Sequence, residues 1–205
     1  MNRGGRAVAL EGPVCAGKTT LGRWLVEDLG RLNVGYVEDY AEHVGGGRFL
    51  PPPMPTSLAE EERALGRLLA IEADRTAHVR DPDSQWGLII VDRSVHTLLA
   101  HCHALTRMRG IDFFGLAERL ISSSDAPLWP DRILYLDVTG SVIDARNAGK
   151  FQHGNLFVDT EFNVGFREYF VKLARRDDGR VIWLDAAGPG ILLQRLAKNH
   201  VAAWM

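Results

Sequence analysis

The chain has 205 residues, of which 46% are hydrophobic and 24% are charged, and its formal net charge at pH 7 is −2. This length and composition predict one globular domain, residues 1–205, and the charge balance excludes the broad basic surface that binds nucleic acid polymers. We find no N-terminal apolar segment typical of a secretion signal and no run of about eighteen apolar residues, so we expect a cytoplasmic protein outside the membrane. Cys15 and Cys102 lack a metal-ligand spacing and are expected to be reduced thiols.

Five short apolar runs alternate with segments of helical periodicity. The runs that predict buried strands are 6–10, 34–38, 87–92, 132–137 and 180–184. The segments that predict helices are 18–30, 57–80, 94–107, 112–123, 141–148, 160–175 and 189–199. Such alternation is typical of an α/β fold, in which helices cover both faces of a parallel sheet. We find no internal repeat and no linker that would divide the chain.

The most specific motif follows the first predicted strand. Residues 12–19 fit the pattern G-x-x-x-x-G-K-[ST], and an amphipathic helix comes next. The N–H groups of such a turn, together with the helix N-terminus, bind phosphate. We expect Lys18 to reach the β- and γ-phosphates of ATP, and the Thr19 hydroxyl to ligate Mg²⁺. The predicted nucleotide-binding residues are Gly12, Pro13, Val14, Cys15, Ala16, Gly17, Lys18, Thr19 and Thr20.

Acidic residues follow the second and third predicted strands. Asp92 ends the third strand in the form of a Walker B motif, which predicts a ligand of Mg²⁺; a helix N-cap is the alternative. Arg93 comes next and carries a planar donor fork that suits a phosphate or carboxylate at the point of transfer. Glu38 and Asp39 end the second strand. Because side chains alternate along a strand, we expect only one of them to face a phosphate acceptor, unless both form a solvated surface pair.

Three further features concern the acceptor side. The loop at about 40–56 contains Gly45–Gly47 and Pro51–Pro53, and it is either a mobile wall of the acceptor pocket or an irregular surface loop. The helix 57–80 contains three arginines, for which we favour exposure to solvent over binding of a ligand. They are Arg63, Arg67 and Arg75. The helix 94–107 contains three histidines that do not share a face, which disfavours a metal site. We expect instead that one of them lines an acceptor pocket. The three are His96, His101 and His103.

Taken in order, these motifs resemble the thymidylate kinase and deoxynucleoside kinase branch of the P-loop kinases. In deoxynucleoside kinases, the second strand ends in a Glu that acts as base toward the sugar 5′-hydroxyl, and the third ends in Glu-Arg-Ser. Thymidylate kinases have Asp-Arg followed by an aromatic residue there. Asp92-Arg93-Ser94 lies between the two patterns, and Glu38-Asp39 and Ser94 are nearer the nucleoside kinases. The resemblance covers nearly the whole chain and implies a P-loop NTPase fold: a three-layer sandwich with a five-stranded parallel sheet and a lid.

The resemblance places the lid at about residues 146–160, where the family brings arginines onto the transferring phosphoryl group. Arg146 and Lys150 fall there, but the segment 147–160 contains no arginine. The charge of the transition state is therefore assigned to Arg146, Lys150 and Arg93, with His153 as a further candidate.

The function predicted from these residues is transfer of the γ-phosphate of ATP, with Mg²⁺, to a nucleoside or nucleoside monophosphate. The predicted catalytic residues are Lys18, Glu38, Asp39, Asp92, Arg93, Arg146 and Lys150, and the predicted metal ligands are Thr19 and Asp92. One alternative is a related kinase that phosphorylates a hydroxyl of an antibiotic, sugar or specialised metabolite. Another is a nucleotide-binding switch, although no Asn-Lys-x-Asp guanine motif occurs. The resemblance also favours a homodimer.

Overall fold

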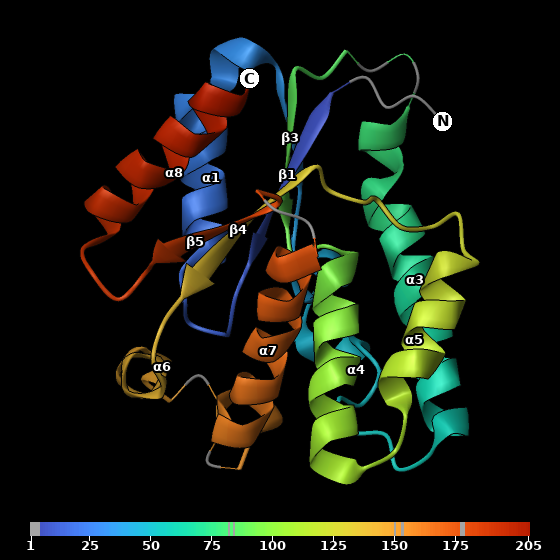
Figure 1. Ribbon diagram of the computed structural model, residues 1–205. Helices are drawn as coiled ribbons and strands as arrows, with labels where there is room; N and C mark the ends of the chain where they lie inside the picture. Colours follow the sequence, from blue (N-terminus) through green and yellow to red (C-terminus); the bar gives the residue numbers. More distant parts are fainter. Residues whose placement is uncertain (1–4, 82, 84, 150, 153, 177–178) are drawn as a thin grey trace.

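The computed structural model describes residues 5–81, 83, 85–149, 151–152, 154–176 and 179–205 (Figure 1). Its centre is a sheet of five parallel strands in the order β2-β3-β1-β4-β5. The strands are β1 (Arg6–Glu11), β2 (Val34–Val37), β3 (Leu88–Asp92), β4 (Arg132–Asp137) and β5 (Val181–Asp185). The central strand β1 pairs with β3 and β4, and Leu10 lies opposite Asp92. The parallel direction brings every carboxyl end to one edge.

Helices form a layer on each face of this sheet (Figure 1). One layer consists of α1 (Lys18–Asp28) and α8 (Gly190–Trp204), and the other of α3 (Leu58–Arg80), α4 (Val95–Arg109), α5 (Phe113–Ser122) and α7 (Thr160–Arg176). The remaining helices are α2 (Tyr40–His43), α6 (Gly140–Asn147) and short 3₁₀ turns at Gly30–Leu32, Gly47–Phe49 and Leu156–Val158. The predicted α/β sandwich with a five-stranded parallel sheet is confirmed.

The apolar runs form strands because both of their faces are covered. Val8 and Leu10 pack on the layer of α1 and α8, whereas Ala7 and Ala9 pack on the layer of α3, α4, α5 and α7. All four side chains are fully buried, as expected for a parallel sheet between two helical layers. None of the described helices is long and apolar enough to cross a membrane.

Many element boundaries differ from the predictions, most of them by one or two residues, and two of the differences have a clear structural cause. The strand predicted at 34–38 ends at Val37, because Asp39 begins the short helix α2 by accepting a hydrogen bond from Ala41 N (2.8 Å). Gly45 and Gly46 then follow α2 with positive φ angles of 79° and 135°. At the other end of the chain, α8 continues past the predicted residue 199 because Val201 is buried in the core.

Candidate active site

The phosphate-loop motif folds into a tight turn between β1 and α1. Gly12 has a φ of 131°, and a Cβ atom there would lie 2.5 Å from the carbonyl oxygen of Leu136, so only glycine fits. Cys15 and Gly17 also have positive φ angles, of 61° and 96°. This turn forms one wall of a cavity of about 630 Å³. The lining residues are Val14, Cys15, Ala16, Gly17, Lys18, Thr19, Thr20, Leu21, Asp39, Arg93, Arg146, Phe151, Ala186, Gly188, Gly190, Leu193 and Gln194.

Lys18 lies beneath this turn and is buried. Its Nζ donates hydrogen bonds to the carbonyl oxygens of Gly12 (3.0 Å) and Pro13 (2.7 Å). Burial, with the nearby charge of Arg93, lowers the pKa of Lys18 to about 7. A phosphate would offer this ammonium group an anionic partner in place of neutral carbonyls, which favours the charged form.

Asp92 and Thr19 meet beside Lys18. The Thr19 hydroxyl donates a hydrogen bond to Oδ2 of Asp92, whose side chain is fully buried, and Oδ1 has no hydrogen-bond partner among the described residues. Burial raises the pKa of Asp92, although the charge of Lys18 opposes this shift. A buried carboxylate oxygen in need of a partner, next to a hydroxyl, fits Mg²⁺, which uses few protein oxygens together with water and substrate phosphates.

Asp39 and Arg93 form an ion pair on the wall of the same cavity. Arg93 Nε lies 2.8 Å from Oδ2 of Asp39, and the Arg93 backbone is left-handed, with a φ of 64°. Glu38 points elsewhere: its Oε1 lies 2.8 Å from Nδ1 of His43, whose Nε2 lies 2.8 Å from Oδ2 of Asp74 on α3. The Glu38 side chain is 41% exposed, against 23% for Asp39. Of the two acids, the structure therefore brings only Asp39 to the cavity.

Arg75 is buried, so the prediction of a solvated side chain is wrong for this residue. It donates to the carbonyl oxygens of Glu38 (2.6 Å), Asp92 (3.4 Å) and Arg93 and to Oε2 of Glu72 (2.8 Å). Its guanidinium also stacks on the Tyr40 ring at 3.8 Å. Arg75 thus ties the carboxyl ends of β2 and β3 together. Arg63 and Arg67 are exposed, as predicted.

Glu11, which the sequence analysis did not single out, is a buried acid directly before the phosphate loop. Its carboxylate accepts hydrogen bonds from Ser94 N (2.8 Å), Ser94 Oγ (2.7 Å) and Thr97 Oγ1 (2.6 Å). Burial raises the pKa of Glu11. One feature of the sequence could have identified Glu11, because an acidic residue here ends an apolar strand directly before a motif that binds anions.

Part of the segment predicted as the lid lines the phosphate-loop cavity. Arg146, at the end of α6, lines the cavity and donates from its guanidinium to the carbonyl oxygen of Ala187 (3.3 Å). Phe151 also lines the cavity, which the sequence did not indicate. Lys150 and His153 lie outside the described residues.

The three histidines of α4 lie apart from the phosphate-loop cavity and have separate partners. His96 is buried against Tyr169 Oη (2.7 Å), and His101 Nε2 donates to the carbonyl oxygen of Pro53 (2.8 Å). Burial lowers their pKa values to about 3 and about 4. No group of three or more His, Cys, Asp or Glu side chains in the described part of the chain could hold a metal ion.

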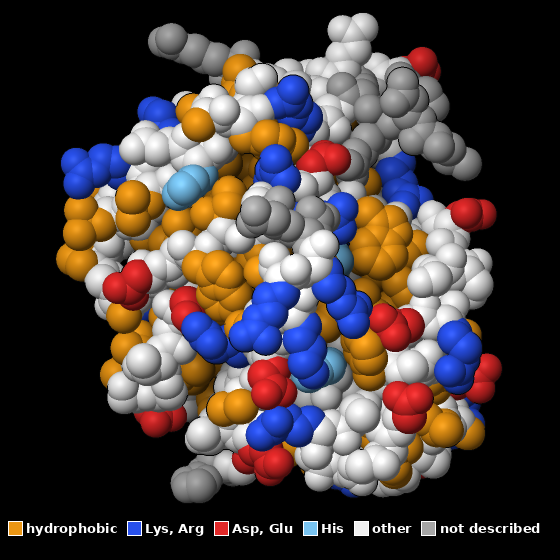
Figure 2. Space-filling model, viewed as in Figure 1, with side chains coloured by type: hydrophobic (Ala, Val, Ile, Leu, Met, Phe, Trp, Pro, Cys, Tyr) orange, Lys and Arg blue, Asp and Glu red, His pale blue; other side chains and the backbone are white. Residues whose placement is uncertain are grey.

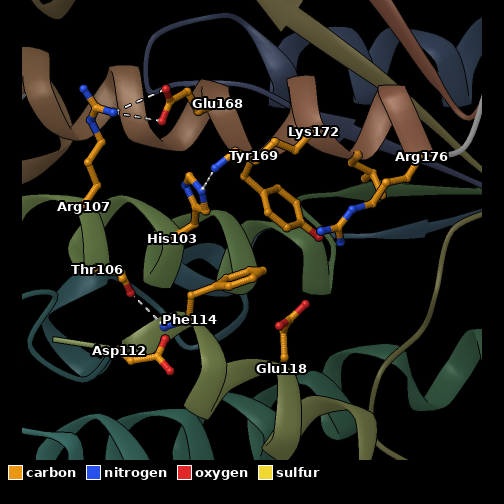
Figure 3. Close-up of a pocket in the computed structure, with 11 residues that line it drawn as sticks. His103, Thr106, Arg107, Asp112, Phe114, Glu118, Glu168, Tyr169, Lys172 and Arg176 are labelled. Atoms are coloured by element: carbon orange, nitrogen blue, oxygen red, sulfur yellow. Dashed lines mark hydrogen bonds and ion pairs between the residues drawn. The ribbon is translucent and has the colours of Figure 1, made fainter. Parts of the chain in front are cut away.

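His103 lines a second cavity of about 420 Å³ between α4, α5 and α7 (Figure 3). Its Nδ1 donates to the carbonyl oxygen of Gly165 (3.0 Å), and its Nε2 accepts from Lys172 (2.9 Å). Figure 2 shows Lys and Arg side chains gathered over α7 and α4; three that line this cavity are Arg107, Lys172 and Arg176. This cavity contains none of the predicted catalytic residues.

No protein-family model matches the chain, and no curated protein matches its sequence. Two solved structures of deoxyadenosine kinase from M. mycoides are similar in fold. One, with the products dCMP and a flexible dCDP bound, is 16% identical with a TM-score of 0.66; the other, with bound dATP, is 17% identical with a TM-score of 0.68. Each match covers 96% of this chain and 99% of the other. The chain therefore has the fold of a P-loop nucleoside kinase, as its motifs predicted.

Proposed function

We propose that this protein is a kinase that transfers the γ-phosphate of ATP to a hydroxyl group of a nucleoside. The observation that carries the proposal is the Asp39–Arg93 pair, which lies on the wall of the phosphate-loop cavity with Nε and Oδ2 2.8 Å apart. A nucleotide switch needs the phosphate loop, whereas the acid and the arginine paired in the same cavity supply what a hydroxyl acceptor requires, an acceptor for its proton and a cation for the transferring group.

The donor half of the site is assigned to the phosphate loop. Its N–H groups and Lys18 would bind the β- and γ-phosphates, and Thr19 and Asp92 would hold Mg²⁺. The metal, when bound, neutralises charge on the phosphate oxygens. Arg146 and Phe151 line the same cavity and would close over the bound nucleotide, which limits the access of water that competes with the acceptor.

The acceptor half is assigned to Asp39 and Arg93. One oxygen of Asp39 accepts from Ala41 N and the other from Arg93, and each retains a lone pair that can accept from a substrate hydroxyl. As the hydroxyl oxygen bonds to the γ-phosphorus, its proton passes to Asp39 and the bond to the β-phosphate oxygen breaks, releasing ADP. The Arg93 guanidinium would stabilise the charge on the transferring group.

The charges around Asp39 favour a hydroxyl acceptor over a monophosphate. Arg75 directs its guanidinium to protein acceptors, and Arg93 is paired with Asp39. The carboxylate that lines the cavity is that of Asp39, whereas Glu38 and Asp74 pair with His43 and do not line it. An ionised phosphate would meet like charge here, whereas a neutral hydroxyl would meet an acceptor for its proton.

The test is a panel of nucleosides, nucleoside monophosphates and non-nucleotide hydroxyl compounds, with release of ADP measured in the presence of ATP and Mg²⁺. We expect release that depends on a nucleoside. Slow release that no acceptor stimulates would support a nucleotide switch and contradict the proposal. Stimulation by monophosphates alone would contradict the assignment of Asp39, and stimulation by non-nucleotide compounds alone would contradict the substrate class.

A further inference from the structure

We infer that Glu11 is a positioning residue, whose buried carboxylate fixes the turn that aims Arg93 at Asp39. The inference rests on the proposed function, in which Asp39 and Arg93 act on the acceptor. Glu11 itself lies behind the site and does not line the phosphate-loop cavity.

The backbone of Arg93 needs external support. Asp92 ends β3 and Ser94 caps α4, so Arg93 alone makes the turn between strand and helix. Its φ of 64° is left-handed, a conformation that is strained for a residue with a Cβ and persists only where the surroundings fix it. The direction of the Arg93 side chain, and hence its contact with Asp39, depends on this conformation.

Three neighbours hold the turn. Arg93 N donates to the carbonyl oxygen of Leu10 (3.1 Å), and the carbonyl oxygen of Arg93 accepts from Arg75. The next N–H group, that of Ser94, donates to Oε1 of Glu11 (2.8 Å). The first contact fixes the peptide group before Arg93, and the other two fix the peptide group that follows it, Arg75 at its carbonyl and Glu11 at its N–H.

Glu11 accepts hydrogen bonds from two residues at the start of α4, Ser94 and Thr97. Its Oε1 also accepts from the Ser94 hydroxyl (2.7 Å), and its Oε2 accepts from the Thr97 hydroxyl (2.6 Å). The negative charge lies at the N-terminus of α4, where the helix dipole favours it. No ion pair of Glu11 is found within the described residues, so its buried charge depends on these hydrogen-bond donors and on the nearby charge of Arg93.

The position of Glu11 in the chain connects the two halves of the site. Glu11 is the last residue of β1, and Gly12 begins the phosphate loop directly after it. Glu11 therefore ends the strand that leads into the donor site, and it also holds the turn that contains Arg93 of the acceptor site. If this contact is lost, Ser94 N is left without its partner, and Arg93 can relax to an ordinary backbone conformation in which its side chain no longer points at Asp39.

The test compares three variants. Glu11→Met is unbranched and fills similar space but removes both acceptor oxygens. Glu11→Gln keeps one carbonyl oxygen that can accept from Ser94 N. Thr97→Val is the matched control, because it removes a hydrogen bond from the same carboxylate and leaves the contact with Ser94 intact. Should Glu11→Met not fold, Glu11→Asp, which withdraws the carboxylate from Ser94, takes its place.

The first measurement determines two quantities in each variant. Release of ADP gives the turnover with the acceptor, and calorimetry gives the affinity for ATP. A misplaced Arg93 should reduce acceptor turnover about 10²-fold in Glu11→Met with little change in ATP affinity. Glu11→Gln should restore most of this loss, and Thr97→Val should stay close to wild type. In an Arg93→Ala background, Glu11→Met should cause almost no further loss, because it acts through Arg93. Losses that multiply in the double variant, or a collapse of ATP binding, would overturn the inference.

The second measurement does not depend on turnover. The side-chain Nε–H resonance of Arg93, assigned by its loss in Arg93→Lys, reports the contact with Asp39 by NMR. It should shift and exchange faster with water in Glu11→Met and stay unchanged in Thr97→Val. An unchanged resonance in Glu11→Met would overturn the inference. If the resonance responds as expected but no acceptor stimulates wild-type ADP release, Glu11 positions Arg93 and the proposed function is wrong.

Discussion

Lys18 and Asp92 are buried charged side chains that have few partners in the protein. Lys18 donates to two carbonyl oxygens of its own loop, and one oxygen of Asp92 has no donor among the described residues. Burial of a charge is costly unless that charge is paired. A triphosphate and a divalent cation would supply the two partners, which distinguishes this arrangement from a structural ion pair.

Lys18→Ala should reduce phosphoryl transfer by at least about 10²-fold, because it removes the charge that meets the β- and γ-phosphates. The fold should persist, and its circular dichroism melt should show this. Lys198→Ala is the matched control, since that lysine pairs with Asp28 on the surface. Turnover above about a tenth of the wild-type rate at saturating ATP would contradict the assignment of the phosphate loop.

Arg93→Lys keeps a positive charge and loses the planar donor fork. We expect transfer to the acceptor to fall much further than ATP affinity, because Arg93 contacts Asp39 on the acceptor side. A coupled assay and calorimetry on one preparation measure the two quantities, with Arg107→Lys on the α4 surface as control. An equal loss of ATP affinity would contradict this assignment and place the role of Arg93 in the donor site.

At the scale of elements, the short helix α2 decides where the acids point. Asp39 caps α2, and this cap directs its other oxygen to Arg93. His43, at the end of α2, holds the helix against α3 through Asp74 and against Glu38. Both ring nitrogens of His43 face carboxylates, which accept hydrogen bonds, so the protonated imidazole satisfies both contacts.

This contact gives the stability a predictable pH dependence. Burial lowers the pKa of His43, but the hydrogen bonds to Asp74 and Glu38 outweigh it, and the pKa is raised overall. The stabilisation is therefore complete below the unfolded value of about 6.5 and is lost as the pH rises through the folded pKa. We expect the difference in Tm between wild type and His43→Gln to be larger at about pH 6 than at about pH 9. The prediction fails if that difference is the same at both values.

The elements themselves were predictable where their causes are local in sequence. Apolar runs such as 88–91 form buried strands, and the phosphate loop is one contiguous motif that needs no distant contact. The choice between Glu38 and Asp39 was not predictable, because β2 ends one residue early when Asp39 caps α2. The burial of Arg75 and the hydrogen bonds of Glu11 were also hidden, since each depends on contacts between segments far apart in the chain.

At the scale of the whole molecule, the strand order brings the site together. β1 lies between β3 and β4, and β2 lies beyond β3, so the phosphate loop, Asp92 and Asp39 all lie at the carboxyl ends of strands that share one edge. Ligands bind at this edge in open parallel sheets. The single domain, the homodimer and the cytoplasmic location stay predictions.

Binding at this edge should stabilise the entire fold. Ligand at about a hundred times its Kd adds about 2.7 kcal/mol to the free energy of unfolding. We expect ATP with Mg²⁺ to raise Tm more than ATP alone, and Asp92→Asn to abolish the part that depends on Mg²⁺. Asp144→Asn, an exposed acid on α6, serves as control. A magnesium response that persists unchanged in Asp92→Asn would remove Asp92 from the metal site.

The central claim is that Asp39, paired with Arg93, activates a hydroxyl acceptor. Its most direct test compares the kcat of Asp39→Asn and Glu38→Gln, with the best nucleoside of the panel and saturating ATP. Asp39→Asn should lower kcat by about 10²–10⁴-fold, as expected for a positioned acid–base group. Glu38→Gln should leave kcat near the wild-type value, because Glu38 pairs with His43 away from the cavity. Equal and small losses in both variants, or a larger loss in Glu38→Gln, would contradict the account.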